Sequence, residues 1–370
     1  MKISHFIAHN QWALPNKHFF IFQLTGSQIY KTVSLQAEKK MDKKNMFKGV
    51  LFVAVGASIF GMLATFVKLS YRDGYTTSEV TTSQFILGLL GLLILNLIQT
   101  KTSKKNLAKP TSKEVGMLML AGTSLGFTSL FYYLSVQYIN VSIAIVLLMQ
   151  SVWISVVVES FLRRKFPTGK KLIATGIVLV GTCLATNLIN LNVKLDWHGV
   201  LWGFLAAVSF TMTMFTSNTL VTHIPVLRKS LIMLCGGAVI VFIYLFFAQI
   251  GPLHFDVLKS LYLNFTDNTA HIKPFDYSIF YTYGFILALF GTIIPPTLFN
   301  LGFPKTGLGL GSIISSLELP VSVTMAFILL GEQVILIQWM GILLILFAIV
   351  LMNLPSKKKE LKSIHIKIDE

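Results

Sequence analysis

Glu318 stands at the centre of an otherwise apolar run, from Thr306 to Leu330, and Pro320 follows two residues later. A carboxylate halfway across a bilayer costs several kcal/mol unless it faces a cavity, finds a partner or takes up a proton. The proline removes a backbone donor and permits a bend in the helix. We therefore expect Glu318 to meet a solute or a coupling proton. The alternative is a neutral carboxyl that bonds to a neighbouring helix.

Three further polar or aromatic side chains lie inside apolar runs. Gln150 and Trp153 are three residues apart and so share a helix face, where an amide beside an aromatic ring suits a bound solute. Tyr132, next to a second tyrosine, is expected to line a polar and aromatic cavity. Ordinary packing between helices is the alternative for each of them.

Lys68 lies near the end of the first apolar run, and Glu79 begins the next. A long cationic side chain at this position either reaches to the membrane interface or forms an ion pair that gates one side. Both possibilities stay open for Lys68. Glu159 precedes Arg163 by four residues, which predicts an ion pair along one helix.

A double proline, Pro295-Pro296, lies within another apolar run, with Asn300 one turn further on. Two consecutive prolines predict a break near the middle of this helix, because each removes a backbone donor. Interrupted membrane helices often line binding sites, so Asn300 is a candidate for contact with a solute. A role of the prolines in packing alone is the alternative.

Catalytic, metal and cofactor sites are not expected. The eight histidines, at positions 5, 9, 18, 198, 223, 254, 271 and 365, fall in tails or at loop edges, and there is no HExxH pattern. No GxxxxGK[ST] phosphate-binding loop occurs. Cys183 and Cys235 lie in apolar runs without metal-ligand spacing and are read as small buried side chains.

Composition places these residues in a bilayer. Hydrophobic residues make up 54% of 370, charged residues 12%, and the mean hydropathy is +0.70. Such a chain has too little polar surface to cover a water-soluble globule of this size. The net charge of +16 lies in loops and tails, so it does not predict nucleic-acid binding.

Ten runs are long enough, or nearly so, to cross a hydrocarbon core about 30 Å thick, which needs roughly 20 apolar residues per helix. They are predicted as helices because an open sheet cannot satisfy its backbone in hydrocarbon. The expected spans are 49–70, 78–99, 115–136, 140–161, 171–188, 199–221, 230–250, 279–302, 307–330 and 334–354.

The distribution of basic residues predicts the orientation. Of 31 lysines and arginines, 26 fall in the segments that share one side with the two termini. The opposite side carries only Arg72, Lys194, Lys259 and Lys273. Because lysine and arginine are enriched in cytoplasmic loops, both termini are predicted to be cytoplasmic, in a cell inner or plasma membrane. Residues 1–46 are expected to form a disordered tail or an extended start, and 355–370 a basic tail.

Internal similarity indicates two halves. Residues 47–68 align with 197–218 without a gap, and six of the 22 positions agree, among them the pair Phe60 and Phe210. A second alignment, of 129–135 with 297–303, carries Gln150 onto Glu318. An odd number of five spans per half makes the two repeats inverted in the membrane, an arrangement that transporters use for alternating access.

The end of the chain resembles a known family. LELPVSVTMAFILLGEQVILIQWMGILLILFAIVL (317–351), with Gly331-Glu332, is similar to the end of an EamA-type repeat of the drug/metabolite transporter superfamily. GASIFGMLATFVKLSYRDG (56–74), including Lys68, resembles the first helix of that repeat. The likeness extends from residue 47 to 354. Gln84, Gln150-Ser-Val and Arg163-Arg164 depart from the family's pattern.

The sequence thus predicts an all-α integral membrane protein of ten helices, with repeats at 47–188 and 197–354. The resemblance implies a secondary active transporter of a small organic metabolite, working by alternating access, with export and proton coupling as further implications. A nucleotide-sugar or sugar-phosphate antiporter is the alternative within transport. A membrane-embedded enzyme and a channel are the alternatives from other classes. The expected partners are a small-molecule substrate, protons and the lipid bilayer.

Overall fold

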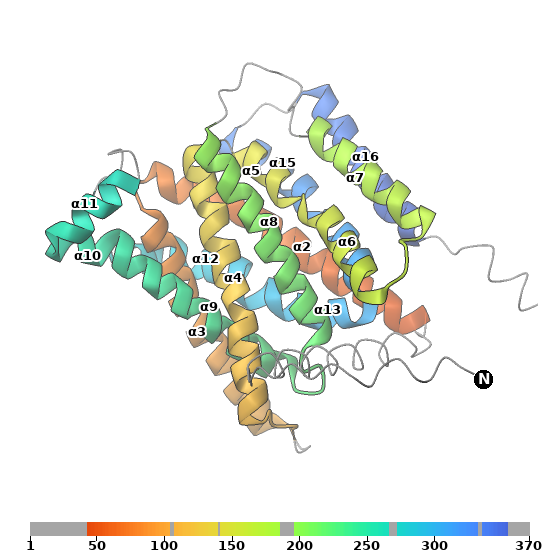
Figure 1. The fold of residues 1–370 in the computed structure, drawn as a ribbon, viewed down its shortest axis with the longest axis horizontal. Helices are drawn as coiled ribbons and strands as arrows, with labels where there is room; N and C mark the ends of the chain where they lie inside the picture. The colour runs from red at the N-terminus through yellow and green to blue at the C-terminus, as the bar shows by residue number, and fades with distance from the viewer. Residues whose placement is uncertain are drawn as a thin grey trace, which may run out of the picture. The chain divides into compact units, whose positions relative to one another are not determined.

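The computed structural model describes residues 43–103, 107–139, 141–185, 196–265, 272–331 and 335–353, and in these ranges it is helical without a strand (Figure 1). The first half of this region contains α2 (Lys43–Arg72), α3 (Thr77–Thr102), α4 (Ser112–Tyr138), α5 (Val141–Leu148), α6 (Ser151–Arg163) and α7 (Gly169–Ala185). The second half contains α8 (Trp197–Thr219), α9 (Val226–Leu245), η1 (Phe246–Ile250), α10 (Gly251–His254), α11 (Asp256–Phe265), η2 (Phe280–Gly284), α12 (Phe285–Leu287), η3 (Ala288–Ile293), α13 (Ile294–Thr306), α14 (Leu308–Ser315), α15 (Glu318–Leu330) and α16 (Leu336–Asn353).

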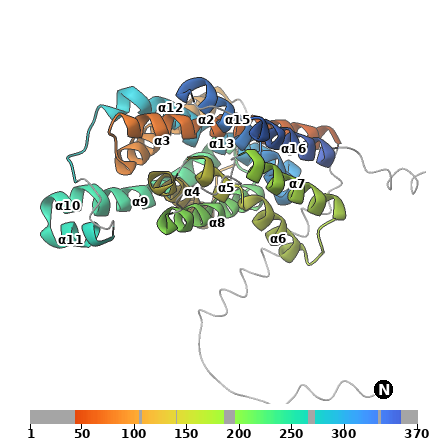
Figure 2. The same cartoon turned by 90° about the horizontal axis from the view of Figure 1, so that it is seen from above.

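Eight helical segments in the described ranges are long and apolar enough to cross a membrane. They are Asn45–Arg72, Thr77–Thr102, Ser112–Tyr138, Ala144–Arg163, Trp197–Thr219, Val226–His254, Phe280–Thr306 and Leu308–Leu330. Each corresponds to one of the ten expected spans. The two remaining runs, predicted at 171–188 and 334–354, correspond to α7 and α16, which are shorter and lie side by side (Figures 1 and 2).

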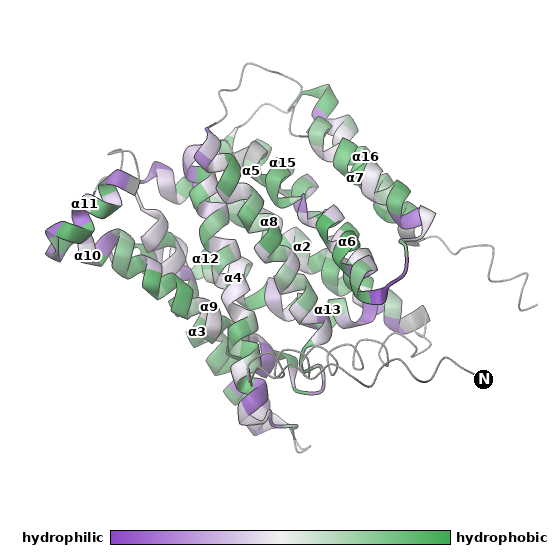
Figure 3. Ribbon diagram, viewed as in Figure 1, coloured by the Kyte–Doolittle hydropathy of each residue, from purple (hydrophilic) through white to green (hydrophobic). Residues whose placement is uncertain are grey.

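Large apolar side chains cover the outside of the helices. Leu120, Phe161 and Leu343 are more than 60% exposed, and many other leucines, isoleucines and phenylalanines face outward. Figure 3 shows this apolar covering along the helices, with hydrophilic residues gathered near helix ends and in the connection from α6 to α7. A surface of this kind is stable in contact with lipid rather than water. The structure is therefore that of an integral membrane protein.

Small residues set the closest helix contact. A Cβ on Gly122 of α4 would overlap the carbonyl oxygen of Met233 on α9, and one on Gly236 would overlap the carbonyl oxygen of Met119. The two backbones therefore touch, which is the packing expected of membrane helices that lack a hydrophobic drive to associate.

Two interrupted spans repeat each other. α5 and α6 are separated by a turn at Met149-Gln150, and α14 and α15 by a turn at Ser316-Leu317. All four bounds of the second pair lie 167 residues after those of the first. The left-handed residues that end them, Arg164 and Gly331, keep the same offset.

The expected alignment of Gln150 with Glu318 is therefore displaced by one residue, and Ser151 is the structural counterpart of Glu318. The reason is a difference in connection length. Residues 139 and 140 separate α4 from α5, whereas Gly307 alone separates α13 from α14. An ungapped alignment that starts in the helix before each interrupted span is therefore out of register by one residue within that span.

The expected break at Pro295-Pro296 is absent, because the span Phe280–Thr306 is helical throughout. The prolines occupy the first turn of α13, and the π-helical segment η3 precedes them. Because the helix continues through them, the prolines leave carbonyl groups of the preceding turn without a donor, and the wider π-helical turn of η3 accommodates them without a break. Pro320 likewise lies in the first turn of α15, directly after the interruption at Ser316-Leu317. The tails predicted at 1–46 and 355–370 lie outside the described residues except for 43–46, as does Glu332.

Candidate functional site

A cavity of about 510 Å³ opens among the C-terminal ends of α2 and α4, the start of α3 and the segment from α9 to α11. We call it the tyrosine cavity, because four tyrosines line it: Tyr71, Tyr75, Tyr244 and Tyr262. The lining also includes the cationic side chains of Lys68, Arg72 and Lys273. Its volume is in the range of small-molecule binding sites.

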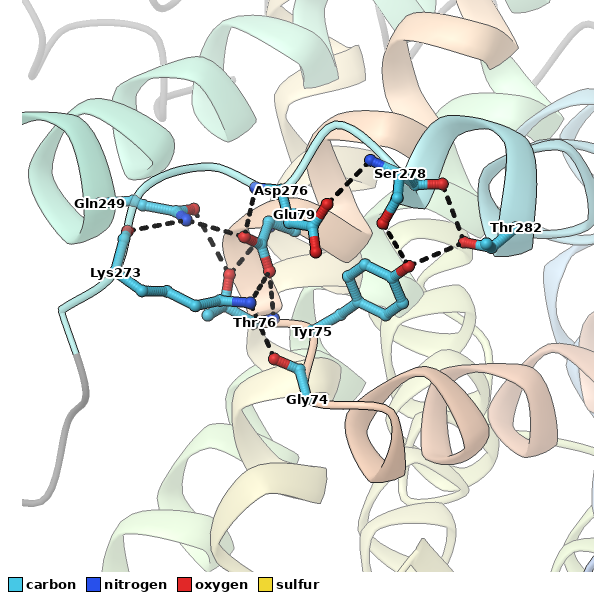
Figure 4. Close-up of polar contacts among 9 residues, drawn as sticks. All are labelled: Gly74, Tyr75, Thr76, Glu79, Gln249, Lys273, Asp276, Ser278 and Thr282. Carbon is cyan, nitrogen blue, oxygen red and sulfur yellow. Dashed lines mark hydrogen bonds and ion pairs between the residues drawn. The ribbon is translucent and has the colours of Figure 1, made fainter.

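The buried carboxylate of Glu79 fixes one wall of this cavity (Figure 4). Glu79 Oε1 accepts hydrogen bonds from Gln249 Nε2 at 3.0 Å and from the backbone N–H of Asp276 at 2.8 Å. Lys273 Nζ lies 3.1 Å from Glu79 Oε2 and donates to the carbonyl oxygen of Gly74 at 2.8 Å. These contacts tie the segment before η2 to the start of α3. Glu79, which the sequence suggests as a partner of Lys68, forms an ion pair with Lys273.

A capping box explains why Glu79 is held in this position. The Thr76 side chain accepts from the backbone N–H of Glu79 at 3.2 Å, and the Thr76 backbone N–H donates to Glu79 Oε2 at 2.6 Å. This reciprocal pair satisfies donors at the start of α3 that have no intrahelical partner. Local contacts at the start of α3 therefore help to hold the carboxylate in place.

Beyond the cavity wall a series of buried polar groups leads inward. The Tyr71 hydroxyl lies 2.9 Å from Thr77 Oγ1, and it donates to the backbone carbonyl of Tyr133 at 3.4 Å. The Tyr133 hydroxyl donates to Gln84 Oε1 at 2.6 Å. Gln84 Nε2 is buried and has no partner among the described residues. Polar groups thus extend from the cavity into the middle of the helices.

Glu318 and Tyr132 are both buried and lie within electrostatic range of each other. Glu318 is the first residue of α15, near the midpoint of its span, and is 2% exposed. Its carboxyl interacts electrostatically with Tyr132, whose ring lies 6.1 Å from that of Tyr133. Among the described residues, neither Glu318 Oε2 nor the Tyr132 hydroxyl has a hydrogen-bond partner. Glu318 is not among the residues that line the tyrosine cavity.

Gly61 determines how α2 passes this pair. A Cβ at Gly61 would overlap the backbone carbonyl oxygen of Glu318, so only glycine permits this approach. On the other half of the chain, Thr211 Oγ1 donates to the carbonyl oxygen of Ser151 at 3.5 Å. Ser151 is fully buried, and its hydroxyl has no partner in the described ranges.

The remaining predicted site residues lie elsewhere. Asn300 and Pro296 border a space of about 20 Å³, enough for about one water molecule, together with Phe60 and Phe210. Asn300 Nδ2 donates to Ser230 Oγ at 3.0 Å. Asn300 is therefore near the centre of the helices but does not line the tyrosine cavity.

Gln150 and Trp153 share a face, as expected, and bond to each other. Trp153 Nε1 donates to Gln150 Oε1 at 2.8 Å, and Gln150 Nε2 donates to the carbonyl of Val146 at 3.0 Å. Trp153 is 36% exposed, in a stripe that continues through the more exposed Val157 and Phe161. This stripe lies on the exposed side of α6, and both polar atoms of the Gln150 amide are bonded to neighbouring residues of the same interrupted span.

A second charged cluster surrounds Glu159, which is 7% exposed. Arg163 Nη2 lies 3.0 Å from Glu159 Oε1, which confirms the predicted pair, and Lys171 Nζ donates to Oε2 at 2.5 Å. The backbone N–H of Gly309, in the first turn of α14, donates to Glu159 Oε2 at 2.9 Å. We call these four residues the Glu159 cluster. It joins α6 and α7 to α14.

The Glu159 cluster and the tyrosine cavity lie toward opposite ends of α2. Gly49, near the start of α2, packs against Lys305 and Thr306, which directly precede α14. The tyrosine cavity includes Lys68, Tyr71 and other residues at the end of the same helix.

Two groups beside the cavity and outside the spans have shifted pKa values. Hydrogen bonds from the Ser278 side chain and backbone N–H hold the pKa of Asp276 below its usual range. Burial raises the pKa of the Tyr262 phenol above its usual range.

Sequence reasoning missed Arg72, Lys273 and Ser151. Arg72 and Lys273 were assigned only to loops, because nothing local shows that residues 201 positions apart line one cavity. The sequence did offer one indication for Arg72. It follows Lys68 by four residues, and residues i and i+4 share a helix face, so the two cations should lie on one side of the helix beside Ser70 and Tyr71.

The apolar spans, the interrupted helices and the polar series between them define a polytopic membrane protein with an internal site. The chain belongs to the EamA-like transporter family, whose model matches residues 47–187 and 197–354. It is 25% identical over 317 residues to the uncharacterized inner membrane transporter YicL of Salmonella typhimurium strain LT2, covering 84% of this chain and 97% of that protein. A protein of known crystal structure has the same fold, with a TM-score of 0.61 at 13% identity over 82% of this chain and 96% of the other.

Proposed function

We propose that this chain is a secondary transporter that moves a small organic solute by alternating access, through ten membrane helices in two inverted repeats. The observation that carries the proposal is the buried carboxyl of Glu318, at the break between α14 and α15, whose Oε2 has no hydrogen-bond partner among the described residues. A carboxyl at mid-membrane is expensive and usually lies on a solute or proton route. The sequence has no GxxxxGK[ST] phosphate-binding loop, so any use of ATP would require another subunit.

Contacts between equivalent residues support the twofold relation of the repeats. Phe60 and Phe210, which align in the two halves, stack on each other with ring centroids 5.8 Å apart. Equivalent residues meet in this way only near the axis that relates them. Gly61 against the Glu318 carbonyl and Thr211 against the Ser151 carbonyl are equivalent contacts on either side of this axis.

In this proposal α7 and α16 are the fifth and tenth crossings, the last of each repeat, and they pack against each other. Five crossings per repeat place the halves in opposite orientations. The excess of basic residues favours a cytoplasmic position of both termini, and with that orientation the tyrosine cavity opens to the outside.

Alternating access requires one end to be closed while the other is open. With the orientation proposed here, the tyrosine cavity is the outer entrance, and the Glu159 cluster closes the cytoplasmic end. Opening inward would separate Glu159 from Gly309 of α14. Glu318 and Tyr132 lie between the two ends.

Proton coupling through Glu318 belongs to the same proposal. A carboxyl that loses and regains a proton during each cycle would change its attraction for a solute and for the Tyr132 hydroxyl. Export as the direction of net transport follows from the family resemblance stated above.

Counterflow in proteoliposomes tests the proposal. Vesicles containing the purified chain are preloaded with an unlabelled organic solute, and uptake of the labelled solute is followed with and without an imposed pH gradient. A carrier gives faster uptake when solute is present on the trans side. Product formation without flux would indicate an enzyme, and flux without trans-stimulation would indicate a channel; either result contradicts the proposal.

A further inference from the structure

The short helix α11 folds back beside α10 after the long span that contains α9 (Figures 1 and 2). With ten residues, α11 is too short to cross the hydrocarbon core. One of its sides packs on the protein. A Cβ on Gly251 of α10 would lie 2.6 Å from Leu258 Cδ1, and Tyr262, four residues after Leu258, lines the tyrosine cavity. α11 therefore forms part of the wall of this cavity.

The other two sides of α11 differ in polarity. Val257 and Leu261 are four residues apart and so share one side, where both are at least 60% exposed. Lys259 follows Val257 by two residues, which places it on the opposite side of the helix, and it is exposed there, as is Asp256. A helix with one apolar and one charged exposed side is suited to the plane of a membrane surface, where lipid and water meet.

The depth of α11 in the membrane follows from its neighbour η1. Gln249 of η1 donates from Nε2 to the backbone carbonyl of Lys273 at 3.3 Å, so η1 lies level with the residues that precede η2. Tyr277 and Tyr281, four and eight residues after Lys273, are largely exposed. Tyrosines are enriched at the boundary between the hydrocarbon core and the headgroups. Because α11 contacts η1, it lies close to this boundary.

An exposed apolar stripe leads along the preceding span to α11. The span Val226–His254 has 29 residues, whereas roughly 20 cross the core, so its end reaches the membrane surface. Exposed apolar side chains recur along it every three or four residues and therefore share one side: Phe242, Phe246, Ile250 and Leu253. Phe255, which is also exposed, connects this stripe to Val257 along the chain. The apolar side of α11 thus continues a surface that already faces lipid.

We infer that α11 lies in the membrane interface with Val257 and Leu261 among lipid acyl chains, while Tyr262 borders the tyrosine cavity. Lipid thereby holds one wall of this cavity in place. The inference goes beyond the proposed function and holds for either orientation of the chain. A second copy of the chain is the other occupant to consider, but a stable interface buries about 800 Å² on each partner, which two side chains do not supply.

The test places a nitroxide spin label on α11 of the purified full chain in phosphatidylcholine vesicles. Val257→Cys and Leu261→Cys carry the label, with Cys183 and Cys235 replaced by alanine, and Lys259→Cys on the same helix is the matched control. Power saturation compares collisions of the label with oxygen, which dissolves in hydrocarbon, and with a neutral nickel chelate, which stays in water. The ratio of oxygen to nickel collisions should be about tenfold higher at 257 and 261 than at 259.

Equal ratios at the three positions would place α11 in water and overturn the inference. Protection of 257 and 261 from both reagents would also overturn it, because protein would then cover this side; dilution with unlabelled chain identifies a second copy. With the label at 257, Leu261→Asp should raise nickel collisions about fivefold, whereas Lys259→Asp should not change them. No response to Leu261→Asp would contradict the anchoring by this side chain. These measurements do not require transport, so a failure of the proposed function leaves the inference in place.

Discussion

At the scale of single residues, the buried neighbours Tyr132 and Tyr133 differ in whether the hydroxyl has a hydrogen-bond partner. The Tyr133 hydroxyl is bonded to Gln84, whereas the Tyr132 hydroxyl, beside Glu318, has no partner in the described part of the chain. Unsatisfied buried groups cost stability, so a chain keeps them where they serve another purpose. Glu318 and Tyr132 are therefore the residues at which activity and stability should separate most clearly.

Glu318→Gln should reduce flux at least about tenfold and remove its dependence on an imposed pH gradient, because the amide cannot take up a proton. Folding should survive, since the amide has nearly the same shape and is neutral. Flux at several pH gradients and size-exclusion profiles measure the two effects. Glu114→Gln, a change in a capping carboxylate at the start of α4, is the control and should keep the pH response. Wild-type coupling in Glu318→Gln would assign Glu318 to structure.

Tyr132→Phe and Tyr133→Phe form a matched pair that removes one hydroxyl each. Tyr132→Phe should leave thermal stability unchanged or raise it, because no described bond is lost, yet it should slow transport. Tyr133→Phe should lower stability by about 1 to 3 kcal/mol, because it leaves Gln84 Oε1 buried without its donor. Thermal unfolding measures the stability of both variants, and counterflow measures their transport rates. If Tyr132→Phe were the less stable of the two, the proposed difference between the two hydroxyls would be contradicted.

At the scale of elements, the Glu159 cluster joins α6 and α7 to α14 through charged side chains and a backbone N–H. Its carboxylate binds two cations and the first turn of α14, so it combines ion pairing with a helix N-terminus. Gly309 is required for this arrangement, because a Cβ there would overlap Glu159 Oε2. A substitution in either helix, at Glu159 of α6 or at Gly309 of α14, can therefore remove this contact.

Glu159→Gln and Gly309→Ala should each weaken the closed cytoplasmic end by about 2 to 3 kcal/mol and shift the protein toward the inward-open state. The measurement is labelling of a cysteine at position 313, on α14, by a membrane-impermeant thiol reagent in inside-out and right-side-out vesicles, with Cys183 and Cys235 replaced by alanine. Both variants should increase labelling from the cytoplasmic side. Unchanged labelling in both would show that the cluster is not a gate.

At the scale of the whole molecule, hydropathy alone located the eight long spans, because a helix that crosses the lipid needs about 20 mostly apolar residues in a row. The internal repeat was visible in the pair Phe60 and Phe210, but the register of the later helices was not. One residue fewer between α13 and α14 moved the counterpart of Glu318 from Gln150 to Ser151. The pairing of Glu79 with Lys273, 194 positions apart, depends on tertiary packing, which no local pattern encodes.

The proposed twofold relation makes a last prediction about motion. Residues beside a symmetry axis stay close when two repeats rock about it, whereas residues far from the axis separate. Phe60 and Phe210 replaced together by cysteine, with the native cysteines removed, should therefore be joined by a short cross-linker in every state. The cysteine at position 313 of α14, with Glu159 and Gly309 left in place, should be labelled from the cytoplasmic side only when that end is open. Solute and pH gradients that change the labelling at 313 should leave the cross-linking yield at 60 and 210 constant. If the labelling and the yield change together, the repeats do not move about an axis at the Phe60 and Phe210 stack, and alternating access in this chain would need another pivot.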